Sequence, residues 1–401
     1  MGLIKTVEGG RLCITPYEYF LMLLFFVLSG FLAGGLIPYK TLIISILGVY
    51  YFISRKKKPN YSVCLYLLSF VLVAFLQKHT FGYTDMGSVF QMSFCAYFIA
   101  IRLGIKFRYA YLNVLYVFCI ISIVFYLAMA LFHILPPNLF PVGELYRSVF
   151  IYNVREGEIL NLRNCGPFWE PGAFAGYICI LFILFFDKLP LLWSVHKTKV
   201  KWILLTLVTT FSTQGYLIMF CIVVFYFLNK RFTVKTVFIS FVLIVFVAVV
   251  VMSVPWLGEK VQEQLVAAQD TESKEGSTNL SRFSTAMIDI YYIMKHPVVG
   301  NTTLPAIRYS DHPHLRSMIE YTGNYGTGSG FTDFMATYGI LPLLVWGWYM
   351  LKTFRKSFGK KASVFCLILL VALGNAECYF LWICYHVFPF LVLNKELKKV
   401  A

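Results

Sequence analysis

Residues 109–133 read YAYLNVLYVFCIISIVFYLAMALFH, a run that contains no Asp, Glu, Lys or Arg. A helix needs about 20 consecutive apolar residues to cross the hydrocarbon core of a bilayer. This run is long enough to do so, and the basic residues Lys106 and Arg108 directly precede it. The stretch therefore predicts a membrane-spanning helix and places the chain among integral membrane proteins.

Similar apolar runs, separated by turn-forming or charged residues, occur along the rest of the chain. They fall near residues 17–33, 40–54, 61–77, 88–101, 172–186, 201–212, 215–228, 236–254, 330–351, 362–374 and 378–393. The 401 residues are 59% hydrophobic and 13% charged, whereas soluble domains are about 45–50% apolar and about 25% charged. We therefore predict an all-α polytopic membrane protein, a single integral membrane domain over residues 1–401 with about 12 transmembrane helices.

The basic residues set the predicted orientation of these helices. The formal net charge is +16, and short cytoplasmic loops of membrane proteins collect Lys and Arg. Lys and Arg cluster in alternate connections, near residues 5–11, 55–58, 102–108, 188–201, 230–235, 352–361 and 395–399. Both termini are then cytoplasmic, and the basic excess reports topology and not a nucleic-acid partner. No small-residue cleavage motif follows the first run, so we expect a retained span and not a removed signal peptide.

Only two segments outside the predicted spans are long enough to hold a site, residues 134–171 and 255–329, and both lie on the outer side in this topology. Long structured loops are usually functional. Two turns between short predicted spans, 212–215 (STQG) and 375–377 (NAE), are also polar. Because polar groups at membrane depth lie against protein or a water-filled cavity, we expect both turns to line a cavity. Ordinary short hairpins are the alternative.

The first outer loop ends in residues 161–172, NLRNCGPFWEPG, directly before a predicted span. Pro171 suits the first position of a helix, and Glu170 before it can either cap the helix end or act chemically. Arg163 offers a planar fork of donors that matches phosphate oxygens, although contact with lipid headgroups is its alternative role. Glu170 and Arg163 are therefore candidate catalytic residues.

The second outer loop contains a predicted amphipathic helix that ends before Pro297. We expect this helix to lie on the outer membrane surface. Its apolar stripe consists of Phe283, Met287, Ile290 and Met294. Arg282, Asp289 and His296 share another face of the helix, because side chains seven residues apart lie nearly above one another. That face looks either into the cavity or into water.

The same loop continues with polar residues that can contact a charged substrate, namely Arg308, Asp311, His312, His314, Arg316, Glu320 and Tyr321. His312 and His314 form an HxH pair, but two ligands without a nearby cysteine predict a metal only weakly. The ten cysteines are scattered without a CxxC pair and are read as small hydrophobes. The two histidines are better suited to act as bases or hydrogen-bond donors. Residues 326–330 (GTGSG) either cradle an anion or form a flexible linker.

Two patterns in these loops resemble the O-antigen polymerase and ligase superfamily. The first is the order of arginine, glycine, phenylalanine, glutamate, proline and glycine in residues 163–172. The second is Arg282 at the start of an amphipathic helix, followed by residues 296–300 (HPVVG) and by residues 331–340 (FTDFMATYGI) running into a span. Together with the predicted spans and the two outer loops, the resemblance covers most of the chain.

The resemblance implies a GT-C-like fold with two large periplasmic loops that contain short amphipathic helices. It implies a metal-independent, inverting glycosyltransferase without a cofactor, in a bacterial inner membrane, with the active site facing the periplasm. Such an enzyme joins oligosaccharide repeat units carried on undecaprenyl pyrophosphate, as donor and acceptor, into O-antigen or capsular-type polysaccharide. Its expected partners are these lipid-linked oligosaccharides and the bilayer, and a chain-length regulator is a further candidate partner.

The chain departs from the family pattern at two places. Ligases of the family carry a histidine–asparagine pair shortly before the glycine that matches Gly339, whereas Gly328 and Ser329 stand here, which favours a polymerase over a ligase. The serine-x-arginine-glycine turn of the family reads STQG in residues 212–215. Gln214 thus replaces an expected positive charge, which Arg308 or Arg316 would have to supply.

The resemblance also suggests roles for the candidate residues. Arg163 and Arg282 match essential arginines, which would stabilise negative charge on the departing pyrophosphate. Glu170 is the first candidate for the general base, followed by His312, His314 and Asp289. The candidates for substrate binding are Arg308, Arg316, Gln214 and Tyr321. A transporter or lipid flippase is the rival class, because many spans with buried polar turns suit it equally well, and an O-antigen ligase is the rival within the family.

Overall fold

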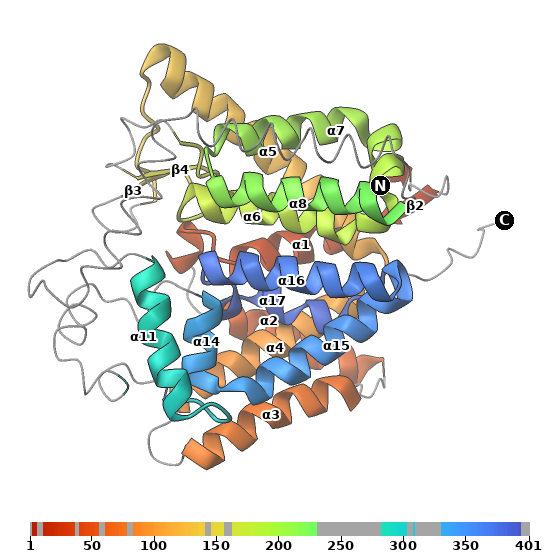
Figure 1. The fold of residues 1–401 in the computed structure, drawn as a ribbon. Coiled ribbons are helices and arrows are strands. Elements are labelled where there is room, and N and C mark those ends of the chain that lie inside the picture. The colour runs from red at the N-terminus through yellow and green to blue at the C-terminus, as the bar shows by residue number, and fades with distance from the viewer. Residues whose placement is uncertain are drawn as a thin grey trace, which may run out of the picture.

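The computed structural model shows a predominantly helical bundle with two small β-hairpins (Figure 1). It describes residues 2–5, 11–36, 40–55, 61–77, 83–140, 146–155, 163–230, 282–302, 308 and 330–393. The predicted all-α class is confirmed. The antiparallel hairpins pair β1 (Gly2–Lys5) with β2 (Arg11–Ile14), and β3 (Tyr146–Ser148) with β4 (Asn153–Arg155).

Most described helices coincide with the predicted apolar runs. They are α1 (Pro16–Leu28), α2 (Lys40–Ser54), α3 (Tyr61–Gln77), α4 (Tyr83–Leu103), α5 (Lys106–Phe132), α6 (Pro171–Leu184), α7 (Leu189–Thr209), α8 (Thr213–Lys230), α11 (Arg282–Lys295), α14 (Gly330–Tyr338), α15 (Ile340–Phe358), α16 (Lys360–Ala376) and α17 (Ile383–His386). Short 3-10 helices are η1 (Ala33–Leu36), η4 (Phe186–Lys188), η6 (Tyr379–Leu381) and η7 (Phe388–Phe390). The predicted span over 236–254 lies outside the described residues.

Within the described part of the chain, α5 is the one helix that is long and apolar enough to cross a bilayer by itself. α6 and the segment Phe186–Thr209 pass the same criteria together, but they bend by 65° at the break between them. α1, α3 and parts of α2, α4 and α8 are shorter apolar helices. The described helices thus provide one or two spans of full length, fewer than the predicted number of about 12.

The helices α7 and α8 are longer than the two short spans predicted over 201–228. α7 has 21 residues because it already begins at Leu189, within the basic segment, and α8 has 18. α8 extends about 27 Å at about 1.5 Å per residue, whereas α7 is kinked at His196, whose φ of −121° and ψ of 32° are not helical. The sequence placed the start of α7 too late because Lys197 and Lys199, directly after this kink, were read as loop residues, whereas long basic side chains also lie along a helix surface.

Residues 330–351, predicted as one span, form two helices that break at Gly339. Its φ of 74° is a conformation that L side chains rarely adopt. Gly300, with φ 69°, lies against it, and a Cβ atom at either glycine would collide with the backbone of the other segment. Ile340 N donates to Pro297 O at 3.0 Å, and Asn301 N donates to Ala336 O at 2.9 Å. The two motifs that carry the family resemblance in the second loop therefore interlock through their backbones.

Residues 378–393, predicted as the last span, form an irregular segment made of η6, α17 and η7. Pro389 cannot donate a backbone hydrogen bond. Hydrogen bonds of buried aromatic side chains join the segment to the neighbouring helices. Trp346 Nε1 donates to Tyr385 O at 2.7 Å, and the Tyr385 hydroxyl donates to Leu370 O at 2.6 Å. The segment packs on α1, α4 and α15 in the middle of the bundle (Figure 1). Packing with the surrounding helices, which sequence periodicity does not report, decides this conformation.

The outer loops differ in secondary structure. The described parts of the first loop, 133–140, 146–155 and 163–170, contain the β3–β4 hairpin and no helix, and the rest of the loop lies outside the described residues. In the second loop the predicted helix is present as α11. It runs across the direction of α7, α8 and α16 at one end of the bundle, whereas β2 lies at the opposite end (Figure 1).

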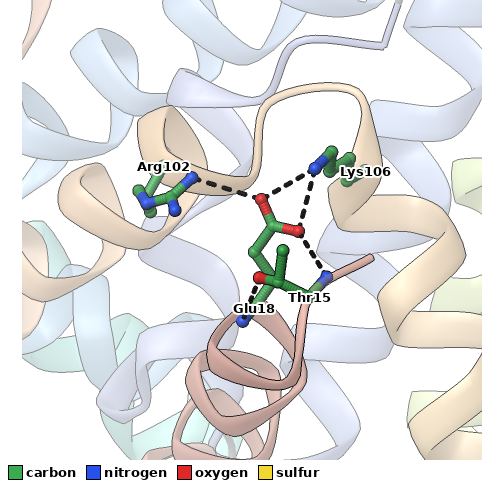
Figure 2. Close-up of polar contacts among 4 residues, drawn as sticks. All are labelled: Thr15, Glu18, Arg102 and Lys106. Carbon is green, nitrogen blue, oxygen red and sulfur yellow. Dashed lines mark hydrogen bonds and ion pairs between the residues drawn. The ribbon is translucent and has the colours of Figure 1, made fainter. Parts of the chain in front are cut away.

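A buried carboxylate joins the start of α1 to the turn between α4 and α5 (Figure 2). Glu18 caps its own helix together with Thr15, whose backbone N donates to Glu18 Oε2 at 2.9 Å. Lys106 Nζ lies 2.9 Å from both carboxylate oxygens, and Arg102 Nη1 lies 3.2 Å from Oε1. Two cations and a helix start therefore compensate the cost of burying this charge.

We expect Glu18→Gln to lower the free energy of unfolding by about 1–3 kcal/mol, because it leaves two cations without their counter-charge. Lys106→Met should cost more than Arg102→Met, since Lys106 contacts both carboxylate oxygens and Arg102 only one. Unfolding of the purified variants in one detergent measures these differences. The reverse order of the two cation variants would contradict this account.

Candidate functional site

Arg163 lies at the end of the first outer loop, against the turn between α7 and α8. Its Nη2 donates to Phe211 O at 3.3 Å, and Phe211 adopts a left-handed φ of 46° in that turn. The next residue, Asn164, is buried: its backbone N donates to Thr209 O at 3.0 Å and its Nδ2 donates to Ser122 Oγ at 3.3 Å. These contacts hold the loop end that carries Arg163 between α5 and the α7–α8 turn.

Glu170 occupies the N-cap position of α6, but its side chain makes no capping hydrogen bond. Glu170 thus stands at the predicted cap position, but it does not cap α6 through a side-chain hydrogen bond. A different carboxylate, that of Glu377, lies at this helix end. A Cβ atom at Gly172, in the first turn of α6, would collide with Glu377 Oε1. Pro171 precedes it at the first helical position, as predicted.

The two polar turns meet beside the start of α6. Gln214 Nε2, from the first turn of α8, donates to Leu373 O of α16 at 3.2 Å. Ser212 and Glu377 are both buried, and Ser212 Oγ lies 3.9 Å from the position of a Cβ atom at Gly172. The structure thus brings the loop end that carries Arg163 and Glu170 to the same end of the bundle as Gln214.

The helix α11 turns its polar face inward and its apolar stripe outward. Asp289 has an exposed fraction of 0%, and its Oδ2 accepts a hydrogen bond from Thr332 Oγ1 of α14 at 2.7 Å. The alternative of a wetted polar face is therefore wrong for Asp289. Met294, from the apolar stripe, is 77% exposed, and His296 at the helix end is exposed. Met287 and Ile290 are exposed as well.

We expect Asp289→Asn to change the free energy of unfolding little, because an amide oxygen still accepts the hydrogen bond from Thr332. Asp289→Leu should cost about 1–3 kcal/mol, since it leaves the hydroxyl of Thr332 without this acceptor. Thermal unfolding of both variants tests this difference. An Asn variant as unstable as the Leu variant would show that the negative charge itself holds α11 on α14.

Arg308 is buried in an ion pair with α14. Its Nη2 lies 2.7 Å from Asp333 Oδ1, and its Nη1 donates to Thr337 Oγ1. Both partners belong to α14. In this structure Arg308 thus ties the second outer loop to α14, whereas the sequence offered it as a replacement for the charge missing at Gln214.

The remaining predicted site residues lie in parts of the chain that the structure does not describe. These are His312, His314, Arg316, Tyr321 and residues 326–329. Arg282 is placed as the first residue of α11, but its side chain is outside the described set. Among the described residues, no group of three or more His, Cys, Asp or Glu side chains is arranged to hold a metal ion.

The helix α14 connects the two halves of the candidate site. At its first residue, Gly330, a Cβ atom would collide with the carbonyl oxygens of Gly374 and Glu377. Thr332 and Asp333, slightly further along, bind Asp289 and Arg308. The start of α14 therefore lies on the 375–377 turn, while its side chains hold the second outer loop.

The chemistry available at this end of the bundle follows from these groups. The guanidinium of Arg163 can bind a phosphate oxygen, and the carboxylate of Glu170 can accept a proton. Tyr152, in the turn before β4, stays a neutral phenol, because burial raises its pKa above the ordinary value. The sequence interpretation missed Glu377 as a functional candidate. The signal was present, since Glu377 is the only Asp, Glu, Lys or Arg in residues 362–394.

No protein-family model matches this chain, and no curated protein matches it at a significant level.

Proposed function

We propose that the protein is a membrane glycosyltransferase that polymerises undecaprenyl-pyrophosphate-linked oligosaccharide repeat units into O-antigen or capsular-type polysaccharide. The observation that supports this most directly is the placement of Arg163 and Glu170. A candidate phosphate-binding cation and a candidate base lie on one loop, which packs on a polar turn at the end of an apolar bundle. Transfer from a lipid pyrophosphate requires both groups.

The surface of the bundle supports a location within a bilayer. Large apolar side chains are exposed along helices far apart in the sequence, including Ile53, Phe75, Val124, Leu344 and Ile368. Soluble monomers rarely expose extensive apolar surface. We propose about 12 spans in a bacterial inner membrane, with cytoplasmic termini and a periplasmic site. The positions of β2 and α11 at opposite ends of the bundle agree with this orientation (Figure 1).

The outward apolar stripe of α11 fits the periplasmic surface of the membrane. Met287, Ile290 and Met294 would enter the boundary between headgroups and acyl chains. Lys295 Nζ lies 4.5 Å from the ring centroid of Tyr291, a combination of cation and aromatic ring suited to the headgroup level. A lipid-linked substrate would then approach the site within the plane of the membrane.

The proposed reaction is one displacement at the anomeric carbon of the donor. The hydroxyl oxygen of the acceptor sugar forms the new glycosidic bond while the bond between the anomeric carbon and the pyrophosphate oxygen breaks. Glu170 takes the proton of the hydroxyl, and Arg163 stabilises the negative charge that appears on the pyrophosphate. The helices α6 and α8 begin beside these groups, and their N-termini add positive partial charge. A single displacement inverts the anomeric configuration.

The function is tested with purified protein in lipid vesicles that contain undecaprenyl-pyrophosphate-linked repeat units. The expected product is a ladder of lengthened glycans on the same lipid, formed equally well in the presence of EDTA and with inverted anomeric configuration. If the repeat units never lengthen under these conditions, the proposal is wrong. Retention of the donor configuration would exclude the single displacement while leaving polymerisation in place.

A transporter or flippase is the second candidate function. It is favoured by the irregular segment 378–393 in the middle of the bundle, because broken helices at the centre of the membrane are common in transporters. The same vesicles distinguish the two functions. Movement of the lipid-linked repeat units between leaflets without any change in glycan length would support the transporter.

A further inference from the structure

Glu377 is a buried carboxylate at the end of α16. It follows the last helical residue, in an extended conformation with φ −142° and ψ 151°, and its exposed fraction is 2%. It lies between two apolar runs, where an ionisable side chain is costly unless its surroundings compensate the charge. Its burial therefore requires a contact that compensates the charge.

The contact of Glu377 is with the first turn of α6. Its Oε1 takes the space that a Cβ atom of Gly172 would occupy. The backbone N–H groups of the first turn have no partner within their own helix, and the N-terminal end carries positive partial charge. A carboxylate at this place therefore stabilises the helix end from another segment, where the N-cap side chain of Glu170 makes no capping bond.

The same carboxylate lies at a junction of three chain segments that carry the candidate site. Ser212, in the α7–α8 turn, is next to Phe211, whose carbonyl accepts the hydrogen bond from Arg163. The backbone carbonyl of Glu377 lies against Gly330 at the start of α14 and accepts a hydrogen bond from Tyr379 N at 2.8 Å. Any displacement of Glu377 would move the start of α6, and Glu170 with it.

We propose that Glu377 is a positioning residue for the glycosyl transfer. Its carboxylate fixes the first turn of α6, so that the carboxylate of Glu170 is directed toward the acceptor hydroxyl and not onto its own helix. This inference rests on the proposed function. Glu377 does not itself contact the substrate, because its side chain is buried against the start of α6.

The experiment measures kcat, KM for the lipid-linked repeat unit and thermal unfolding in the vesicle system described above. Glu377→Gln should reduce kcat by about 100-fold, the effect expected when a reacting group is misplaced by about 1 Å, with KM nearly unchanged. Glu377→Asp, which keeps the charge on a shorter side chain, should recover part of kcat. Glu18→Gln is the matched control. It also removes a buried carboxylate that caps a helix, but at the start of α1 and not of α6. Its kcat per folded molecule should stay at the wild-type value.

A double variant tests the contact itself. Gly172→Ala alone should reduce kcat, because its methyl group collides with Glu377 Oε1. Added to Glu377→Ala, it should cause no further loss, because the space is then vacant. Additive losses would overturn the proposed contact.

The outcomes separate this inference from the proposed function. If the wild-type protein lengthens lipid-linked repeats and Glu377→Gln does so with an unchanged kcat, the positioning role is wrong and the polymerase stands. If Glu377→Gln does not fold, Glu377→Asp and the double variant distinguish a positioning role from a purely structural one. A purely structural residue would lower the amount of folded protein without changing kcat per folded molecule. If the wild-type protein does not polymerise, both proposals fail.

Discussion

Arg163→Ala is expected to reduce the rate of polymerisation by about 100–1,000-fold, the usual effect of removing one donor that stabilises developing negative charge. The variant should still fold, because the hydrogen bond from Nη2 to Phe211 O contributes only about 1 kcal/mol. Arg163→Lys should retain the charge but lose the planar fork of donors, so its rate should lie between those of the wild-type protein and of Arg163→Ala. The ladder of glycan lengths formed in vesicles gives the rates, and thermal unfolding gives the amount of folded protein.

Arg147→Ala provides the matched control, since Arg147 lies on β3 of the same outer loop and has no part in the proposed reaction. Its rate should equal that of the wild-type protein. Arg282→Ala should behave like Arg163→Ala if both arginines stabilise the leaving pyrophosphate. Glycan ladders of normal length from both the Arg163 and the Arg282 variants would remove these residues from the site.

The second large effect is expected at the break between α14 and α15. Gly339→Ala should destabilise the protein by about 3–6 kcal/mol. This loss is the sum of two costs, that of a backbone conformation available almost only to glycine and that of overpacking by the added methyl group. The added Cβ atom would meet backbone atoms of Val298 and Gly300, and backbone cannot rotate away as a side chain can. Unfolding in detergent measures the loss, and poor yield of membrane-inserted protein is its extreme form.

Gly347→Ala is the control for this substitution. Gly347 lies in the interior of α15, and a Cβ atom there meets nothing within 4 Å. Because alanine favours a helix over glycine, this variant should be as stable as the wild-type protein or more stable by about 0.5–1 kcal/mol. If the two alanine variants were equally stable, the interlock of residues 298–300 with Gly339 would not contribute to the fold.

The sequence predicts the helices best where an apolar run has clear ends. The predicted run 61–77 and the helix α3 have the same limits, because Asn60 and Lys78 bound it. The break at Gly339 was not predicted, since the conformation of this glycine depends on residues 298–300, far away in the sequence. The irregular path of 378–393 depends on aromatic packing against α1, α4 and α15. Such contacts leave no periodic signal in the segment itself.

The candidate site was predictable in part. Arg163 and Glu170 stood out because a charged residue next to a predicted outer helix start has few structural roles. Glu377 was seen only as part of a polar turn, although it is a lone acid between apolar runs. Its contact with Gly172 joins residues more than two hundred positions apart. A single sequence does not report such a pair, and it left open whether Asp289 faces the cavity or water.

The ion pair at Glu18 also constrains the order in which the protein can be assembled. The N-terminus is synthesised first, and Arg102 follows Glu18 by 84 residues, a delay of about 4–17 s at about 5–20 residues per second. During this time α1 carries a carboxylate whose two cations do not yet exist. A buried charge without its partners is costly, so the N-terminal end of α1 can complete its packing only after the turn between α4 and α5 has been synthesised. The first helix to be made is then among the last to complete its contacts.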